Sequence, residues 1–207
     1  MKLKMKFYRL IKKIIDPLIA LICLIILSPL FFIISILIKK DSKGKIIFRQ
    51  KRIGHDQKIF TMYKFRTMVK DAEKLKEKYK HLDFTDGPVF KIREDPRFTK
   101  IGKKLAKTNL DELPQLLNIL KGNMYFVGFR PPLPDEIPQY EEWQLKRFKG
   151  YPGLTSSWAI SGMHHIKFDE WIKIDIDYND NQSLFLDLNI IWKTGLKFIK
   201  IIRNIFY

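Results

Sequence analysis

Residues 17–38 read PLIALICLIILSPLFFIISILI, an apolar run without a single charged side chain. At a rise of 1.5 Å per residue, a helix of this length reaches roughly 33 Å, about the thickness of the hydrocarbon core of a bilayer. No small-residue cleavage site follows the run, so it does not resemble a signal peptide. Its length alone predicts a membrane helix.

Ser28 and Pro29 stand at the centre of this run. Pro29 cannot donate the helical hydrogen bond and its ring clashes with the preceding turn, so we expect the helix to break here. Each arm then extends roughly 16 Å, about as far as the bilayer midplane. The Ser28 hydroxyl is placed to bond a carbonyl that the break leaves free.

Both flanks of the run are strongly basic. The preceding residues are Lys2, Lys4, Lys6, Arg9, Lys12 and Lys13, and the following ones are Lys39, Lys40, Lys43, Lys45, Arg49, Lys51 and Arg52. The positive-inside rule would place both ends in the cytoplasm, which a re-entrant hairpin satisfies and a single crossing does not. A kinked single-pass anchor fits the same residues, because membrane helices tolerate proline. Asp16 and Pro17 are typical of an N-cap followed by proline at the first helical position.

The remainder of the chain predicts an α+β fold that is mostly helical, with residues 1–40 as the membrane-embedded segment and 41–207 as a separate domain outside the bilayer, which the resemblance described below implies is catalytic. Hydrophobic periodicity and turn formers predict a small β-hairpin over 45–68, a helix over 69–82, a loop over 83–96, and helices over 99–107 and 110–121. The prolines at 131, 132, 134 and 138 predict extended or turning backbone.

Residues 188–206 form the clearest amphipathic pattern. One side carries Ile191, Trp192, Phe198, Ile199, Ile202, Ile205 and Phe206, and the other carries Lys193, Lys197, Lys200 and Asn204. A basic stripe opposite an aromatic-containing apolar face is typical of a helix lying in the membrane interface. A helix that covers the core of a soluble domain has the same pattern.

The composition narrows the possible partners. The 207 residues include 39 Lys and Arg against 22 Asp and Glu, a formal net charge of +17. This excess of positive charge indicates an anionic partner, such as phosphates, acidic lipid headgroups or nucleic acid. Because 46% of the residues are hydrophobic, the chain is not a disordered basic tail. The lone Cys23 excludes a disulfide framework, and the histidines, including adjacent His164 and His165, lack metal-ligand spacing.

The segment Thr108-Asn-Leu-Asp111-Glu112-Leu-Pro114-Gln-Leu116 is the most informative. Pro114 is tolerated only in a first helical turn, so the two carboxylates lie at the positive end of a helix. That end favours ionised carboxylates and a nearby phosphate or metal. An ionised carboxylate can attack phosphorus in covalent catalysis, and neighbouring carboxylates suit Mg²⁺. The alternative is a capping box formed by Thr108 and Asp111, which needs no active site.

Two basic segments are candidate phosphate ligands. Gly128-Phe129-Arg130-Pro131-Pro132 puts Arg130 on a rigid turn, and Tyr63-Lys64-Phe65-Arg66-Thr67-Met68 ends the hairpin with two cations. The alternative for each segment, taken by itself, is an ordinary solvated basic surface that binds no phosphate. No Walker-type loop or strand–GxGxxG–helix unit is present.

Together and in order, these segments resemble the bacterial sugar transferase family, the monotopic polyprenol-phosphate phosphoglycosyl transferases in their minimal catalytic core. The matching segments are the Ser28-Pro29 break, FRQKRIG (48–54), YKFRTM (63–68), DPRFTKIG (95–102), LDELPQLLNILKGNM (110–124), VGFRP (127–131), PGLT (152–155) and SLFLDL (183–188).

The resemblance implies an enzyme on the cytoplasmic face of the bacterial inner membrane, with UDP-sugar, undecaprenyl phosphate and anionic lipid as partners and Mg²⁺ as cofactor. Asp111 would attack the sugar-bearing β-phosphate and release UMP, and undecaprenyl phosphate would then take the phosphosugar. Glu112 would assist through Mg²⁺ or proton handling, and Lys64, Arg66 and Arg130 would hold phosphates. Asp187 matches a conserved acidic position to which the resemblance gives no role.

Some residues depart from the family pattern. Phe129 stands where a proline is usual, Tyr151 stands where a basic residue is usual, and residues 156–162 around Trp158 differ. The sugar, the glycan pathway and the oligomeric state therefore stay open. Rival interpretations are a non-catalytic polybasic protein that binds acidic lipid and a membrane-tethered nucleic-acid binder. The scattered basic residues form no recognised nucleic-acid-reading motif, so we expect no nucleic acid partner.

Overall fold

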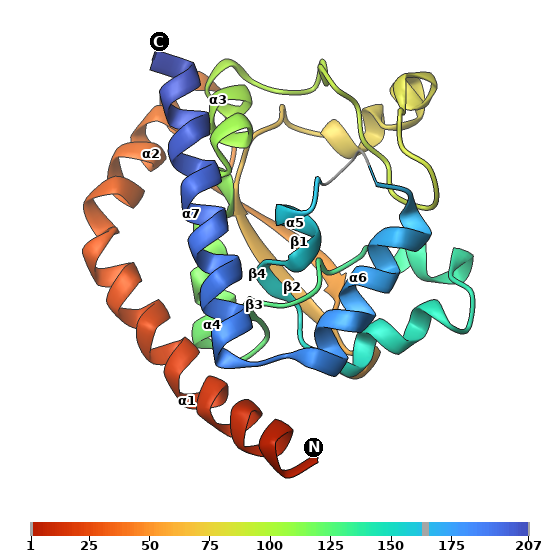
Figure 1. Ribbon diagram of the computed structural model, residues 1–207. Helices are drawn as coiled ribbons and strands as arrows, with labels where there is room; N and C mark the ends of the chain where they lie inside the picture. Colours follow the sequence, from red (N-terminus) through yellow and green to blue (C-terminus); the bar gives the residue numbers. More distant parts are fainter. Residues whose placement is uncertain (1, 163–165, 207) are drawn as a thin grey trace.

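The computed structural model describes residues 2–162 and 166–206, so His164 and His165 lie outside the described residues. Most described residues are helical, and the strands form two small two-stranded sheets, as the α+β prediction requires. In Figure 1, the first two helices form an arc along one side of the molecule, and the last helix runs between that arc and the remaining elements.

The apolar run of the N-terminus forms two helices, α1 (Lys2–Ile26) and α2 (Ser28–Asp41). The predicted break is confirmed. Pro29 lies in the first turn of α2 and cannot donate to the Ile25 carbonyl, and the Ser28 hydroxyl donates to that carbonyl instead, at 2.8 Å.

None of the described helices is, by itself, both long and apolar enough to cross a bilayer. Phe7–Ile26 and Ser28–Asp41 meet that requirement together, and they are bent by 63°.

The predicted start of a helix at Asp16-Pro17 is wrong. The helix α1 continues through Pro17, and Asp16 lies in its interior. The Asp16 carboxylate instead accepts a hydrogen bond from the backbone N–H of Phe126, at 3.0 Å. The carboxylate that would have accepted a capping hydrogen bond thus accepts one from Phe126, a residue 110 positions away.

The hairpin is confirmed as β1 (Ile47–Ile53) and β2 (Ile59–Phe65), antiparallel, with Ile47 opposite Phe65 and Ile53 opposite Ile59. A 3₁₀ turn, η1 (His55–Gln57), connects them. The helix predicted over 69–82 is not continuous. Two 3₁₀ segments replace it, η2 (Ala72–Leu75) and η3 (Glu77–Leu82), because its thin apolar stripe buries only Ala72. Residues 83–96 form a loop, as predicted.

The next elements carry the candidate carboxylates. The helix α3 (Lys100–Thr108) begins after Thr99, whose side chain accepts from the N–H of Gly102. Asn109 adopts a left-handed conformation and turns the chain into the 3₁₀ helix η4 (Leu110–Gln115), which continues directly as α4 (Leu116–Leu120).

The rest of the chain contains the second sheet and the elements that follow it in sequence. This sheet was not predicted from the sequence. Strands β3 (Tyr125–Val127) and β4 (Gly153–Thr155) pair in parallel. Between them lie η5 (Pro134–Gln139) and η6 (Gln144–Lys149), and after them come α5 (Ser157–Ile160), α6 (Phe168–Asn181) and α7 (Leu184–Phe206).

Two apolar cores join α1 and α2 to the rest of the protein. Ala20 of α1 packs in a core with Leu116, Ile119 and Met124. Farther along the arc, a second core contains Ile34, Ile38, Phe65 and Leu105. The carboxylate-bearing segment η4–α4 therefore rests on the N-terminal arc.

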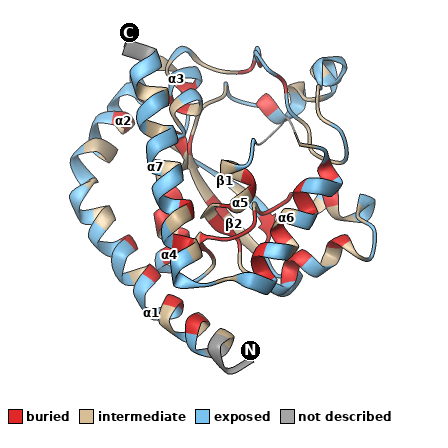
Figure 2. Ribbon diagram, viewed as in Figure 1, coloured by how far each residue is buried: buried red, intermediate tan, exposed pale blue. Residues whose placement is uncertain are grey.

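Much of the outer surface of the arc and of α7 is exposed (Figure 2), and many of the exposed side chains are large and apolar. The exposed side chains include Phe7, Leu10, Ile14, Leu18, Ile25, Phe32 and Ile33 on the arc, and Phe185, Leu188, Trp192, Leu196 and Ile199 on α7. Scattered single apolar residues are normal on a soluble surface, but a continuous set of this size marks an interaction surface. Trp192 and Ile199, predicted to face the membrane interface, are more than 60% exposed, so this side of α7 does not cover the core.

Candidate active site

Asp111 and Glu112 lie in the first turn of η4. The alternative of a capping box is wrong, because Thr108 is the last residue of α3 and its hydroxyl donates to the carbonyls of Lys104 and Leu105. Asn109, at the N-cap position of η4, makes no capping hydrogen bond with its side chain. The two carboxylates therefore have no capping function that would account for them.

A buried asparagine fixes this turn against the hairpin. Asn118 is fully buried in α4, accepts from the N–H of Tyr63 at 3.1 Å and donates to the carbonyl of Thr61 at 2.7 Å. These are hydrogen bonds that a neighbouring strand would otherwise make along the edge of β2. The sequence offered one signal for this contact, a lone amide within the apolar stretch LLNIL.

The docking of α4 on β2 brings Lys64 to both carboxylates. Its Nζ lies 2.6 Å from Oε1 of Glu112 and 3.9 Å from Oδ2 of Asp111. All three side chains are less than 25% exposed, where charge-assisted hydrogen bonds are strong. The structure thus joins three of the residues that the sequence singled out.

The environment pushes the pKa values of the two carboxyls apart. Burial, with a smaller contribution from the Glu112 charge, raises the pKa of Asp111 to about 6 against the opposing effect of Lys64. Burial also acts on Glu112, but Lys64 and Arg130 outweigh it and hold the pKa of Glu112 below its usual value. Burial therefore opposes the stabilisation of the charged Asp111 that its place at the start of a helix predicts. The pair combines a Glu112 whose charged form is favoured with an Asp111 that is unusually basic yet largely ionised at neutral pH.

The turn that carries Arg130 is held rigidly on several sides. A Cβ at Gly128 would overlap the carbonyl oxygen of Tyr151, so β3 and β4 approach at a distance that only glycine permits. The Arg130 carbonyl accepts from Arg147 at 3.0 Å. Phe129, the departure from the family pattern, is fully buried and packs edge-on against Phe148. The Arg130 guanidinium acts electrostatically on both Asp111 and Glu112.

Three further charged residues belong to this site and were missed from the sequence. Arg52 is buried in β1, donates to the carbonyl of Pro131 at 3.0 Å, and lies within electrostatic reach of Arg130, Glu136 and Glu112. Burial, with the nearby Arg130, lowers the pKa of Arg52 to about 10, and burial raises that of Glu136. Arg52 lies in the segment FRQKRIG (48–54) that matches the family, but neither it nor Glu136 was predicted as a site residue.

Lys91 is the third of these residues and comes from the long loop 83–96. It lies within electrostatic reach of Arg130, Glu112 and Lys64. Lys91 is an exposed residue, yet the protein around its ammonium removes enough water, with help from Arg130, to lower its pKa to about 8. The backbone of Lys91 is fixed by hydrogen bonds to the Asp83 carboxylate and to the N–H of Phe84.

The structure does not bring Arg66 to this site. Its Nη2 donates to the carbonyls of Ile38 and Ser42 and to the Ser42 hydroxyl, at 2.6 to 3.3 Å. Arg66 therefore secures the end of α2. Its expected phosphate-binding role stays a prediction that the geometry does not favour, because β2 ends at Phe65 and the chain then turns toward α2. Ser28, Pro29 and Asp187 also lie away from Asp111 and Glu112. Ser28 and Pro29 are at the helix break, and Asp187 accepts a hydrogen bond from Tyr8 of α1.

The carboxylate pair is compatible with Mg²⁺ only where the ion is shared with the phosphates of a substrate. Among the described residues, no group of three or more His, Cys, Asp or Glu side chains could hold an ion. Mg²⁺, however, commonly takes one or two carboxylates and completes its octahedron with substrate phosphates and water. Asp111 and Glu112 fit an ion of this kind, which is shared with the substrate.

Comparison with known proteins gives a consistent result. Residues 7–201 match the family model described as bacterial sugar transferase. The galactosyl transferase CpsE of Streptococcus agalactiae is 42% identical over 195 residues, which cover 92% of this chain and 43% of CpsE. The exopolysaccharide production protein ExoY of Sinorhizobium fredii is 38% identical over 191 residues, which cover 88% of this chain and 83% of ExoY.

A third relative, the undecaprenyl-phosphate galactose phosphotransferase of Salmonella typhimurium, is 36% identical over 195 residues. The aligned region covers 90% of this chain and 40% of that protein. The chain thus spans less than half the length of CpsE and of the Salmonella protein, and most of the length of ExoY.

Proposed function

The chain belongs to the bacterial sugar transferase family, and from this premise we propose that it is a phosphoglycosyl transferase. It moves a sugar-1-phosphate from a UDP-sugar to undecaprenyl phosphate and so begins a surface glycan at the cytoplasmic face of the inner membrane. The names of relatives support the substrate class, since one is an undecaprenyl-phosphate galactose phosphotransferase and another an exopolysaccharide production protein.

One observation carries the proposal. Asp111 and Glu112 lie together in one helical turn. Lys64 bonds Glu112 and stands 3.9 Å from Asp111, and Arg130, Arg52 and Lys91 are within electrostatic reach of Glu112. A protein that only binds acidic lipid has no need of a buried and a half-buried carboxylate side by side, because both repel anionic headgroups. Carboxylates surrounded by cations suit a reaction between an aspartate and a diphosphate, because the cations offset the repulsion between the anions.

In the first step, a carboxylate oxygen of Asp111 attacks the β-phosphorus of the UDP-sugar. The bond from that phosphorus to the bridging oxygen breaks, and UMP leaves with the oxygen. The raised pKa of Asp111 marks a more basic and hence more nucleophilic oxygen, which is still largely ionised near pH 7. Lys64, Arg130 and Lys91 hold the phosphates in line for this attack.

In the second step, a phosphate oxygen of the lipid carrier attacks the phosphorus bound to Asp111. The bond between phosphorus and the Asp111 oxygen breaks, which restores the free carboxylate and yields undecaprenyl-diphosphate-sugar. Mg²⁺, held by Asp111 and Glu112 together with phosphate oxygens, would supply further charge neutralisation.

The proposed membrane arrangement rests on the exposed apolar surface of α1, α2 and α7. The 63° bend lets both arms enter the lipid and return on the same side, as the basic flanks require. A site held at headgroup depth allows the long prenyl tail to remain in the hydrocarbon while its phosphate reaches Asp111.

The test is an assay of UMP release by purified protein with Mg²⁺, undecaprenyl phosphate and a panel of UDP-sugars that includes UDP-galactose and deoxyamino sugars. Asp111→Asn should abolish release, while Glu112→Gln should retain an Asp111-bound phosphosugar detectable by mass spectrometry. A wild-type protein that releases no UMP with any sugar of the panel would refute the proposed reaction. Release that survives Asp111→Asn would refute the nucleophile alone.

A further inference from the structure

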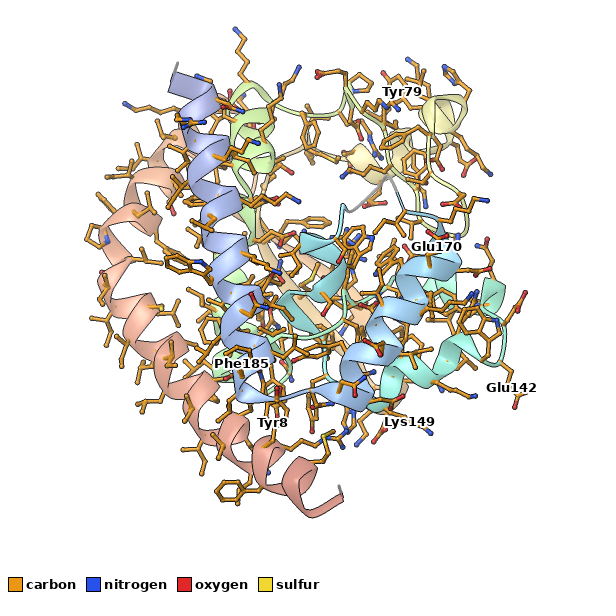
Figure 3. The ribbon with its side chains drawn as sticks, viewed as in Figure 1. Tyr8, Tyr79, Glu142, Lys149, Glu170 and Phe185 are labelled. Atoms are coloured by element: carbon orange, nitrogen blue, oxygen red, sulfur yellow. The ribbon has the colours of Figure 1, made fainter. Side chains whose placement is uncertain are left out.

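A buried polar cluster, separate from the active site, joins α1 to the last two helices. It consists of Tyr8, Lys12 and Asp16 of α1, Tyr178 of α6 and Asp187 of α7, each at most 6% exposed. The spacing of four residues puts the three α1 members on one face of that helix. In Figure 3, Tyr8 lies where α1 passes the first turn of α7, the turn that carries Phe185.

Asp187 is the centre of this cluster. Its Oδ2 accepts from the Tyr8 hydroxyl at 2.8 Å and from the Lys12 ammonium, and its Oδ1 accepts from the Tyr178 hydroxyl at 2.6 Å. A single carboxylate on α7 thus binds three donors from two other helices. Lys12 also lies 3.3 Å from the Asp16 carboxylate, which in turn holds the N–H of Phe126.

These contacts differ in kind from the others that α1 makes. Farther along the helix, Ala20 packs against Leu116 and Ile119 through apolar contacts, which are non-directional and tolerate a small rotation of the helix. Hydrogen bonds to a carboxylate depend on angle, and a buried charge that loses its partners is costly. The Asp187 cluster therefore fixes the rotation of α1 about its own axis.

The rotation of α1 decides which of its side chains face outward. With Tyr8, Lys12 and Asp16 turned inward, the exposed side carries Phe7, Leu10, Ile14 and Leu18. The segment η4–α4, which carries Asp111, packs on the same helix. A change in the rotation of α1 would tilt the active site relative to the bilayer.

We propose that Asp187 is a positioning residue, which holds α1 at the rotation that places Asp111 at the depth of the lipid carrier's phosphate. This inference rests on the proposed function, and it gives Asp187 a role that the sequence did not assign. Asp187 does not touch the substrate. It acts on the second step alone, because only that step needs a phosphate anchored in the bilayer.

The test separates the two steps in protein reconstituted into phospholipid nanodiscs. Asp187→Asn keeps the shape of the side chain and leaves Lys12 paired with Asp16. We expect stoichiometric UMP release from the water-soluble UDP-sugar to stay close to the wild-type rate. Transfer from Asp111 to undecaprenyl phosphate should fall by about 100-fold, the cost of a misplacement of about 1 Å between reacting groups.

The matched control is Asp95→Asn, which removes another buried carboxylate paired with a cation, Arg97, at 2.6 Å. Neither residue contacts α1 in the part of the chain that the structure describes. If Asp187→Asn slows both steps equally and in proportion to a lower Tm, as the control does, the cluster only stabilises the fold and the inference is wrong. Tyr8→Phe, which removes the hydrogen bonds of the Tyr8 hydroxyl to Asp187 and Tyr178 and no charge, gives a second test if Asp187→Asn does not fold.

A direct measurement of helix rotation completes the experiment. A nitroxide label at Ile14, in a Cys23→Ser background, reports the depth of the outward face of α1 by its accessibility to oxygen and to a soluble nickel complex. The accessibility should shift in Asp187→Asn and stay unchanged in Asp95→Asn. An unchanged label combined with normal transfer would overturn the role of Asp187, whereas a wild-type protein that releases no UMP would overturn the proposed function instead.

Discussion

The Nζ of Lys64 lies 2.6 Å from Oε1 of Glu112, and this contact joins the end of the hairpin to the turn that carries both carboxylates. The ammonium also stands 3.9 Å from Asp111. It therefore neutralises one carboxylate while leaving the other free to react.

Replacement of Lys64 by methionine should remove this neutralisation. Because Lys64 lowers the pKa of both carboxyls, its loss would raise the proton affinity of the Asp111 nucleophile, and the site would also lose a cation that binds phosphate. We expect the rate of UMP release to fall by about 100- to 1000-fold, the usual effect of losing one preorganised charge-stabilising group. Lys58→Met, at an exposed position beside the start of β2, is the control. Equal rates for the two variants would contradict the role of Lys64.

Lys91 predicts a pH dependence of substrate affinity. With a pKa of about 8, its ammonium is charged below pH 8 and can bind phosphate, and it loses the proton above that pH. The KM for the UDP-sugar should therefore rise by about tenfold between pH 7 and pH 9, which corresponds to the loss of one charge-assisted hydrogen bond. Lys91→Arg keeps its charge throughout and should flatten the profile. A profile that is the same in both proteins would assign the titration to another group.

Two glycines predict opposite changes in stability. A Cβ at Gly102 of α3 would overlap the carbonyl oxygen of Thr67, so Gly102→Ala should lower the free energy of unfolding by about 1–3 kcal/mol. Gly195 of α7 has open space around its Cα, and Gly195→Ala should raise that free energy by up to about 1 kcal/mol. Chemical denaturation of both variants in the same detergent measures the difference. A loss of stability in Gly195→Ala would show that its surroundings are not open.

The bend at Pro29 predicts that both ends of the apolar run are exposed on the same side of the membrane. Single cysteines at Lys13 and at Lys43, in a Cys23→Ser background, should both react with an impermeant maleimide applied to inside-out vesicles, and neither should react in right-side-out vesicles. Pro29→Ala restores the missing N–H and favours a straighter helix, which should reduce the labelling of one of the two sites. Opposite sidedness in the parent protein would support the kinked single-pass anchor.

The sequence determined the features that depend on neighbours along the chain. Pro29 breaks the helix because it lacks an N–H and clashes within its own turn, and Ser28 then bonds the carbonyl that becomes free. The hairpin arms and the helix after Thr99 follow from local periodicity and capping. Pro114 likewise confines Asp111 and Glu112 to the first turn of a helix. All of these interactions span four residues or fewer, or join segments that a short loop connects.

Only the tertiary structure decided which charged side chains meet. Asp16 resembles an N-cap locally, yet Phe126 takes its carboxylate, and Arg66 secures α2 while Lys91 of a turn-rich loop joins the site. Asp187 finds Tyr8 across 179 positions of sequence. The reason is physical. The cost of burying a charge and the partners that offset it are set by the side chains that surround it in space, and the packing of α1, α4 and α7 brings those together from distant parts of the chain.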